Sequence, residues 1–141
     1  MSARAVLAVV LMTISLASPA AAMRISDDQG GQIGEYLARF KALKLSGERI
    51  IIDGTCASAC TMLLGVIPRD RICVTSRAVL AFHSAWDPTP DGTRLSAAGN
   101  QYLWSNYPDA VRKWISQHGG LRSRLIYLRG SELAAMYPTC R

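Results

Sequence analysis

The chain has 141 residues, half of them hydrophobic and 18% charged, and its formal net charge at neutral pH is +6. This length suits one domain with one core. Nucleic acid is not an expected partner, because the chain has no recognised binding motif and no basic run interleaved with aromatic residues. Attraction of the basic chain to anionic polymers or lipid head groups is an alternative that depends on charge alone.

The first 22 residues have the three parts of an export signal. Arg4 supplies a positive charge, the run from Ala5 to Leu16 is apolar, and three consecutive alanines end at Ala22. We predict cleavage after Ala22, which leaves a single domain over 23–141 in the periplasm or outside a bacterial cell. An uncleaved membrane anchor is the alternative, but the apolar run is shorter than the roughly 20 residues of a spanning helix. Later apolar runs are interrupted by Arg, Asp or Gly, so no span is expected in the mature domain.

The mature chain begins with the pattern of a βαβ unit. A short strand is predicted over 23–26, followed by a tight loop over 27–31. Apolar residues then recur at helical spacing over 33–45, and Ser46-Gly47 ends this helix. The β-branched run over 50–52 is typical of a strand buried on both faces.

The next segments repeat this logic. Small residues over 54–57 form a turn, and a short buried helix is predicted over 58–66. Two further strands are expected over 71–75 and 78–82, because both are rich in β-branched and other apolar residues. The sequence therefore predicts an α/β fold with a parallel sheet.

Beyond the sheet the chain changes character. A loop is predicted over 87–92, because it is rich in Pro, Asp and Gly. Three helices are predicted after it, over 95–106, 108–117 and 121–136. The expected fold is thus a parallel sheet followed by a helical C-terminal part.

The cysteines predict two disulfide bonds, because an even number in an exported domain is typical of such bonds. Three pairings are open, and those that join the tail to the sheet are favoured because a long closed loop restricts the unfolded chain most. Zinc is the alternative, but there is no second close cysteine pair and His83 and His118 are not spaced as ligands. A redox pair would need two-residue spacing. No metal or other cofactor is predicted. The four cysteines are Cys56, Cys60, Cys73 and Cys140.

Ser58 lies between two alanines at the predicted turn from strand to helix. The ordinary interpretation of such a serine is a helix cap. However, His83 closes a predicted strand, and the carboxyl ends of parallel strands meet along one crevice. The loop at Gly30-Gly31 follows an earlier strand and should reach the same edge. A serine, a base and a loop of backbone donors are therefore expected to converge.

This combination suits acyl transfer. A serine hydroxyl is a poor nucleophile unless a neighbouring base takes its proton, and imidazole has a suitable pKa. The negative oxygen that forms on the attacked carbonyl needs fixed donors. The amide of Ala59 and an amide of the glycine loop are the candidates.

Three segments carry a resemblance to a known family: 25–31 (ISDDQGG), 54–60 (GTCASAC) and 71–83, which includes RICV and AVLAFH. In order and spacing they resemble the superfamily of the Clp protease proteolytic subunit and crotonase, and within it small exported bacterial proteins of largely unassigned activity. The resemblance covers about the first half of the mature chain. It implies Ser58 as nucleophile and His83 as general base, with an oxyanion hole formed by the amides of Gly31 and Ala59.

The third catalytic residue is less clearly marked. In the family an acid follows the histidine at some distance, and this chain has Glu132 where an aspartate is expected. Asp109 and Asp87 are alternatives, and a surface glutamate without a catalytic role is the ordinary interpretation of Glu132. A serine and histidine pair without an acid would be slower.

The leading interpretation is an exported serine hydrolase that acts on peptide or protein substrates. The alternative is a non-catalytic envelope protein on the same fold, braced by disulfides, which binds a partner or has a structural role. In that case Ser58 is only a cap. The sequence leaves the substrate and the oligomeric state open.

Overall fold

The computed structural model describes residues 21–141. All but the last two residues of the predicted export signal, 1–22, therefore lie outside the described residues. Within the described part, no helix is long and apolar enough to cross a membrane.

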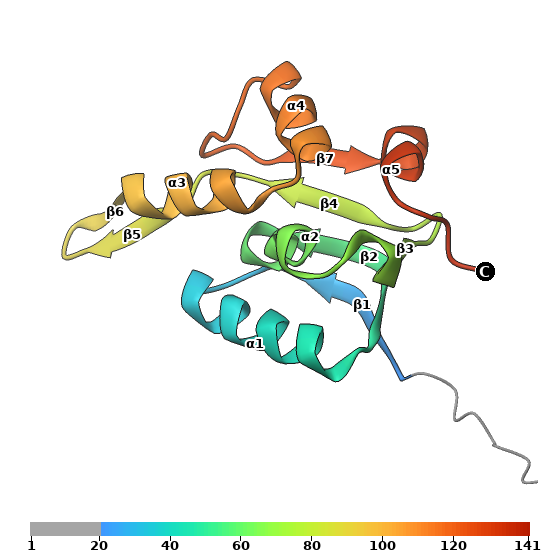
Figure 1. The fold of residues 1–141 in the computed structure, drawn as a ribbon. Helices are drawn as coiled ribbons and strands as arrows, with labels where there is room; N and C mark the ends of the chain where they lie inside the picture. The colour runs from blue at the N-terminus through green and yellow to red at the C-terminus, as the bar shows by residue number, and fades with distance from the viewer. Residues whose placement is uncertain (1–20) are drawn as a thin grey trace, which may run out of the picture.

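The first third of the described chain forms the predicted βαβ unit. Strand β1 (Ala22–Asp28) and strand β2 (Arg49–Ala57) are parallel neighbours, and helix α1 (Ile33–Ser46) connects them. Figure 1 shows α1 alongside these two strands. The strands are longer than expected, since β1 includes the aspartates that the sequence assigned to the loop.

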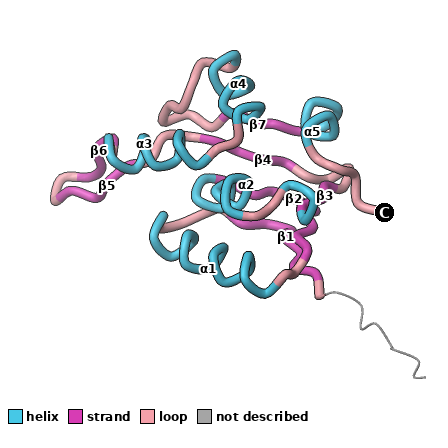
Figure 2. The backbone as a smooth tube through the Cα atoms, viewed as in Figure 1, coloured by secondary structure: helices cyan, strands magenta, loops and turns pink. Residues whose placement is uncertain are grey.

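Two short strands continue the sheet along one side of β2. Strand β3 (Ile72–Val74) pairs with the first half of β2, and strand β4 (Val79–Phe82) pairs with its second half, both in parallel. Between β2 and β3 the chain forms a 3-10 helix (Ser58–Met62), helix α2 (Leu63–Val66) and a second 3-10 turn. Consequently β1, β2 and β4 all end at the same edge of the sheet, where Figure 2 shows their loops at the left of the view.

The prediction of one long helix over 121–136 is wrong. Strand β7 (Ile126–Arg129) pairs antiparallel with β4, and only helix α5 (Gly130–Met136) follows it. The free edge of β4 has backbone groups that need hydrogen-bond partners, and β7 supplies them. Gly130, with a φ of 60°, separates strand from helix. The sheet is therefore mixed, although most of its strands are parallel.

The predicted loop over 87–92 is largely a hairpin. Strand β5 (Trp86–Thr89) and strand β6 (Gly92–Leu95) pair antiparallel and form a separate two-stranded sheet, which extends away from the rest of the fold (Figure 1). Prolines argued against a strand here, but a small exposed ribbon tolerates them at its edges. Helices α3 (Ala97–Asn106) and α4 (Asp109–Gln117) match their predictions within two residues.

The core forms between the sheet and its helices. Ile50 and Ile52 of β2 are fully buried, whereas the intervening Ile51 is only partly buried, so the isoleucine run is not covered equally on its two faces. Phe82 at the end of β4 contacts the rings of Tyr107 and Trp114, with ring centroids 5.4 and 6.0 Å away. This aromatic cluster joins the helical C-terminal half to the sheet.

Both disulfide bonds predicted from the sequence are present. Cys56 pairs with Cys60, and Cys73 pairs with Cys140. The second bond joins the tail to β3, as the loop-length argument favoured. Backbone hydrogen bonds on both sides of Val74, with Pro138 and Cys140, reinforce it. All four sulfurs are therefore engaged and are not available as thiolate ligands.

Asp53 links β2 to the neighbouring strand β1 and to the loop that follows β3. Its carboxylate accepts hydrogen bonds from Arg24 on β1 and from Thr75 and Arg77 after β3, and the residue is 7% exposed. The hydrogen bonds from Arg77 and Thr75, with a further one from Arg24, hold the pKa of Asp53 well below its usual range. This carboxylate is occupied in bracing the fold.

Candidate functional site

Ser58 has a strained backbone. Its φ is 54°, and it is the only non-glycine residue with a positive φ in the described part of the chain. Left-handed geometry costs a non-glycine residue about 1–2 kcal/mol, so the surrounding structure must enforce it. The Cys56–Cys60 disulfide encloses the turn, and the hydroxyl of Thr61 donates to the carbonyl of Ser58 at 2.6 Å.

The structure does not use Ser58 as a helix cap. The N-cap position of the 3-10 helix that begins at Ser58 is occupied by Ala57, whose methyl side chain cannot accept a hydrogen bond. Among the described residues, the hydrogen bond given for Ser58 uses its carbonyl oxygen and not its hydroxyl. A cap serine would offer its oxygen to the amides two or three residues later. The first amides of this helix, including that of Ala59, have no acceptor within the helix. The serine hydroxyl is thus not committed to the structural role that the sequence first suggests.

The glycine loop packs directly on the Ser58 turn. A Cβ atom built on Gly30 would lie 2.6 Å from Cβ of Ser58, 2.6 Å from the carbonyl oxygen of Ala57 and 2.9 Å from the amide nitrogen of Ala59. The φ of Gly30 is 83°, which also favours glycine. Only a residue without a side chain can bring the loop this close to the serine.

Asp28, at the end of β1, holds this loop in place. Its Oδ1 accepts hydrogen bonds from the amide of Gly30 at 2.9 Å and from the hydroxyl of Tyr36 at 2.5 Å. Arg39 of α1 donates to Oδ2 at 3.2 Å. Burial, together with the hydrogen bond to Asp28, raises the pKa of Tyr36 to about 12, so the phenol stays protonated and keeps donating. The sequence analysis missed Asp28, although its place before two glycines was a usable signal.

Gly30→Ala is expected to slow modification of Ser58 by a serine-directed probe by at least about 10-fold. The added methyl group displaces the turn that presents the serine, and small errors of position are costly in acyl transfer. The measurement is the rate of probe labelling, followed by mass spectrometry. Gly34→Ala is the matched control, because Gly34 lines the same cavity but a Cβ atom added there meets nothing within 4 Å. Equal labelling rates for Gly30→Ala and the unmodified protein would show that the close packing is irrelevant to the serine.

The orientation of His83 leaves one ring nitrogen free to act as a base. His83 follows β4, and its Nδ1 lies 2.7 Å from the carbonyl oxygen of Ser84. A carbonyl only accepts hydrogen bonds, so in this contact Nδ1 carries the proton. Nε2 of the neutral ring is then unprotonated and able to accept one. The backbone carbonyl of Ser84 thus orients the imidazole ring.

Four of the five residues that the sequence placed in the site line one cavity of about 690 Å³, which we call the nucleophile cavity, and Glu132 is the exception. Ser58 and Ala59 enter from the end of β2, Gly31 from the end of β1, and His83 from the end of β4. The convergence at one sheet edge follows from the parallel order of these strands. Its volume lies in the range of ordinary ligand sites. The structure gives no hydrogen bond between the Ser58 and His83 side chains, a contact that often tightens only with substrate bound.

Glu132 does not line this cavity. Because β7 runs antiparallel to β4, Ile126 lies opposite Phe82, whereas Arg129 lies opposite Val79 at the other end of the strand. Glu132 lies beyond Arg129 in α5, after the end of β7 that is farther from His83. Its carboxylate instead accepts a hydrogen bond from the indole of Trp114 at 3.2 Å. The sequence-based choice of Glu132 as the acid is therefore not supported.

Asp109 and Asp87, the two alternatives for the catalytic acid, have different surroundings. Asp109 is paired with Arg112 on α4. Asp87, on β5, lines the nucleophile cavity, and its closest cation is Arg94 across the hairpin at 3.9 Å. Asp87 is thus the only one of the three candidate acids in the cavity, although His83 Nδ1 already has the carbonyl of Ser84 as its acceptor. The sequence analysis placed this aspartate in a loop and missed the hairpin that carries it to the site.

The segment after His83 is fixed by polar contacts that the sequence analysis also missed. The side chain of Asn100 on α3 accepts from the amide of Ala85 at 2.8 Å and donates to the carbonyls of Ala85 and Ser96. The amide of Ser84 donates to the carbonyl of Arg122 at 2.7 Å. These bonds set the direction in which the hairpin leaves the sheet, and with it the position of Trp86 in the cavity.

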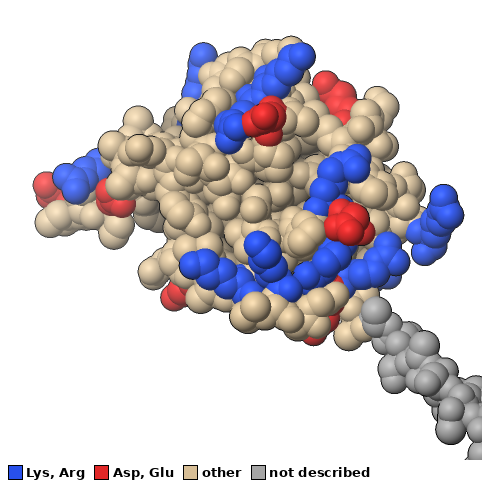
Figure 3. Space-filling model, viewed as in Figure 1, with Lys and Arg blue, Asp and Glu red and all other residues tan. Residues whose placement is uncertain are grey.

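A metal site and a basic surface that binds anionic polymers or lipid head groups both find little support in the described residues. No group of three or more His, Cys, Asp or Glu residues is arranged to hold a metal ion there. Figure 3 shows basic side chains along the lower part of the molecule, over α1 and its surroundings. Part of this charge has a structural role, since Arg71 donates to the carbonyls of Leu43, Lys44 and Glu48, and Arg69 donates to that of Met136.

Comparison of the sequence with known protein families finds no family model that matches, and comparison with curated proteins finds no similar chain. The function is therefore argued from the geometry of the site.

Proposed function

We propose that the protein is a serine hydrolase that cleaves peptide bonds, with Ser58 as nucleophile and His83 as general base. One observation carries the proposal: Ser58 is held in a strained conformation at the wall of a cavity that His83 also lines. Strained residues persist only where the surrounding structure enforces them, and they are concentrated at functional sites. A cap would need no such conformation.

The chemistry follows from the free nitrogen of the imidazole. Nε2 takes the proton of the Ser58 hydroxyl as its oxygen bonds to the substrate carbonyl carbon. The oxygen of that carbonyl becomes negative and is stabilised by backbone amides, for which Gly31 and Ala59 are the candidates. The protonated imidazole, held by the carbonyl of Ser84, then gives its proton to the leaving nitrogen. Water repeats these steps on the acyl-enzyme and releases the acid.

The proposal extends to the fold family and to the location of the protein. A serine at a strand end beside a glycine loop, on a mostly parallel sheet, supports a fold like that of the Clp peptidase and crotonase superfamily. The two disulfide bonds support an oxidising compartment, which agrees with the export signal expected over 1–22.

A fluorophosphonate probe tests the proposal directly. We expect the folded, oxidised protein to be labelled stoichiometrically, and peptide mapping should find the adduct on Ser58. Denatured protein is the control, because a serine that is activated by its neighbours reacts only in the fold. If the probe does not label the folded protein, or labels other serines equally, the hydrolase is excluded and the non-catalytic binding or structural role remains.

A further inference from the structure

A second cavity, of about 420 Å³, lies on the hairpin side of His83. It shares only His83 and Trp86 with the nucleophile cavity and contains neither Ser58 nor the glycine loop. We call it the hairpin cavity. It is lined by His83, Ser84, Trp86, Thr93, Arg94, Leu95, Ser123 and Leu125.

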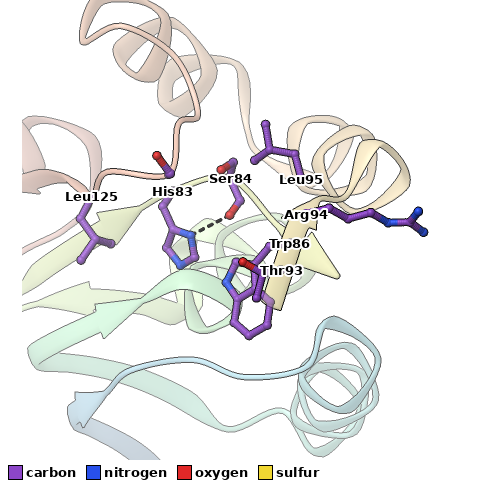
Figure 4. Close-up of a pocket in the computed structure, with 8 residues that line it drawn as sticks. His83, Ser84, Trp86, Thr93, Arg94, Leu95 and Leu125 are labelled. Carbon is purple, nitrogen blue, oxygen red and sulfur yellow. Dashed lines mark hydrogen bonds between the residues drawn. The ribbon is translucent and has the colours of Figure 1, made fainter. Parts of the chain in front are cut away.

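The walls of the hairpin cavity come from two parts of the fold. Trp86 and Leu95 are directly opposite each other in the β5–β6 hairpin, whereas Leu125 comes from the loop before β7. Figure 4 shows the imidazole of His83 between Leu125 on one side and Trp86 on the other, with Arg94 extending away from it. The ring of the proposed base therefore lies between two apolar side chains of this cavity, while Ser84, Thr93, Arg94 and Ser123 add polar groups to its wall.

The apolar residues of the hairpin are unusually exposed. Trp86 is 55% exposed and Leu95 is 66% exposed, and the two side chains form a cross-strand pair. Adjacent exposed apolar side chains beside a cavity are typical of a binding surface. The hydroxyl of Ser84, in a residue that is 3% exposed, is also buried without a hydrogen-bond partner in the described structure. Both features are unexplained by the packing of the fold itself.

The direction of proton transfer assigns a role to this cavity. The imidazole first receives the serine proton and then gives it to the leaving nitrogen, so the leaving group must lie against the ring. The nucleophile cavity contains the serine and the candidate oxyanion donors, and it therefore suits the acyl part of a substrate. The hairpin cavity touches the proposed centre at the ring and at the neighbouring Trp86.

We propose that the hairpin cavity binds the residue on the leaving-group side of the cleaved peptide bond, and that it prefers an apolar side chain there. This inference rests on the proposed hydrolase. In the step concerned, the bond from Ser58 Oγ to the carbonyl carbon forms and the carbon–nitrogen bond breaks. The proton moves from Oγ through His83 Nε2 to the leaving amine. By microscopic reversibility, an amine that fits the same cavity attacks the acyl-enzyme in competition with water.

Competition between amines and water tests the inference. The acyl-enzyme is formed with p-nitrophenyl acetate, and phenylalaninamide or glycinamide is added as acceptor. We expect transfer to phenylalaninamide to exceed transfer to glycinamide by at least about 10-fold, because only the former buries an apolar side chain. The Ser58→Ala protein measures the uncatalysed background.

Substitutions of two leucines that line the hairpin cavity test whether this cavity causes the preference for phenylalaninamide. Leu95→Ala and Leu125→Ala should each reduce the ratio of the two transfer products by about 3- to 10-fold, since apolar contact area is lost. Leu45→Ala is the matched control, because Leu45 is a remote leucine on α1 that is 88% exposed. The ratio is measured within each variant, so general changes in activity cancel.

Each outcome either supports or overturns the inference about the hairpin cavity. A preference for phenylalaninamide that the two wall variants reduce and Leu45→Ala leaves intact supports the inference. An acyl-enzyme that transfers equally to both amides, or whose preference survives both wall variants, overturns the inference while the hydrolase stands. If no acyl-enzyme forms on Ser58, the hydrolase and the inference fail together.

Discussion

Ser58→Ala and His83→Ala are each expected to reduce probe labelling and peptide cleavage by about 10⁴- to 10⁶-fold. The alanine at position 58 removes the attacking oxygen, and the alanine at position 83 removes the acceptor of its proton. Rates of labelling and of cleavage, measured on purified oxidised protein, check this prediction. Because the two residues act as a unit, the double variant should be little worse than either single one. Losses that multiply would indicate two unrelated roles.

Stability provides the control for this prediction. Ser58→Ala should melt close to the unmodified protein, because Ser58 does not occupy the N-cap position of its helix, where Ala57 lies. Ser58→Gly should be inactive but more stable, by about 1 kcal/mol, since glycine accepts a φ of 54° without strain. Thermal unfolding measures both. A Ser58→Gly protein that melts earlier than the original would contradict the strain on which the proposal depends.

Removing the Cys73–Cys140 disulfide, with alanine at both positions, is expected to lower the free energy of unfolding by about 4 kcal/mol. The bond spans 67 residues of chain, and closing so long a loop strongly restricts the unfolded state. For a domain of this size the melting temperature should fall by about 10–20 °C. Denaturant titration and calorimetry measure the change.

Removal of the Cys56–Cys60 disulfide should instead affect probe labelling more than stability. Cys56 and Cys60 are only four residues apart, so their bond restricts the unfolded chain less, by about 2 kcal/mol. The bond encloses Ser58, however, and its removal should slow probe labelling sharply, whereas removal of the tail disulfide leaves labelling of the folded protein intact. Equal effects of the two removals on labelling would show that the short disulfide does not hold the serine.

The sequence by itself determined the parallel part of the fold and which loops of that part meet at one edge of the sheet. The isoleucine run of β2, the helical spacing over α1 and the short apolar run of β4 each have a local periodicity that requires no knowledge of the rest of the chain. Once three parallel strands are established, their carboxyl ends must share an edge. Gly31, Ser58 and His83 are therefore brought to one cavity by topology alone.

The helical expectation for 121–136 failed because local pattern and long-range pairing disagreed. Leu121, Leu125 and Leu128 recur at helical spacing, and a strand of four residues is too short to show a clear alternation. The unpaired edge of β4 decided the outcome, and such an edge is a property of the assembled sheet. Because the sequence analysis assigned β7 to a helix, it could not predict where Glu132 lies.

Only the tertiary structure decided which groups surround the histidine. The sequence analysis expected a carboxylate beside His83, but Nδ1 of His83 is hydrogen-bonded to the carbonyl of Ser84. Every residue has a backbone carbonyl, so such an acceptor cannot be recognised from the sequence. The hairpin that brings Trp86 and Asp87 to the cavity is set by contacts of Ala85 with Asn100, 15 residues away. Local periodicity determined which strands form, whereas the direction of side chains around the site depended on hydrogen bonds between segments that only the folded chain brings together.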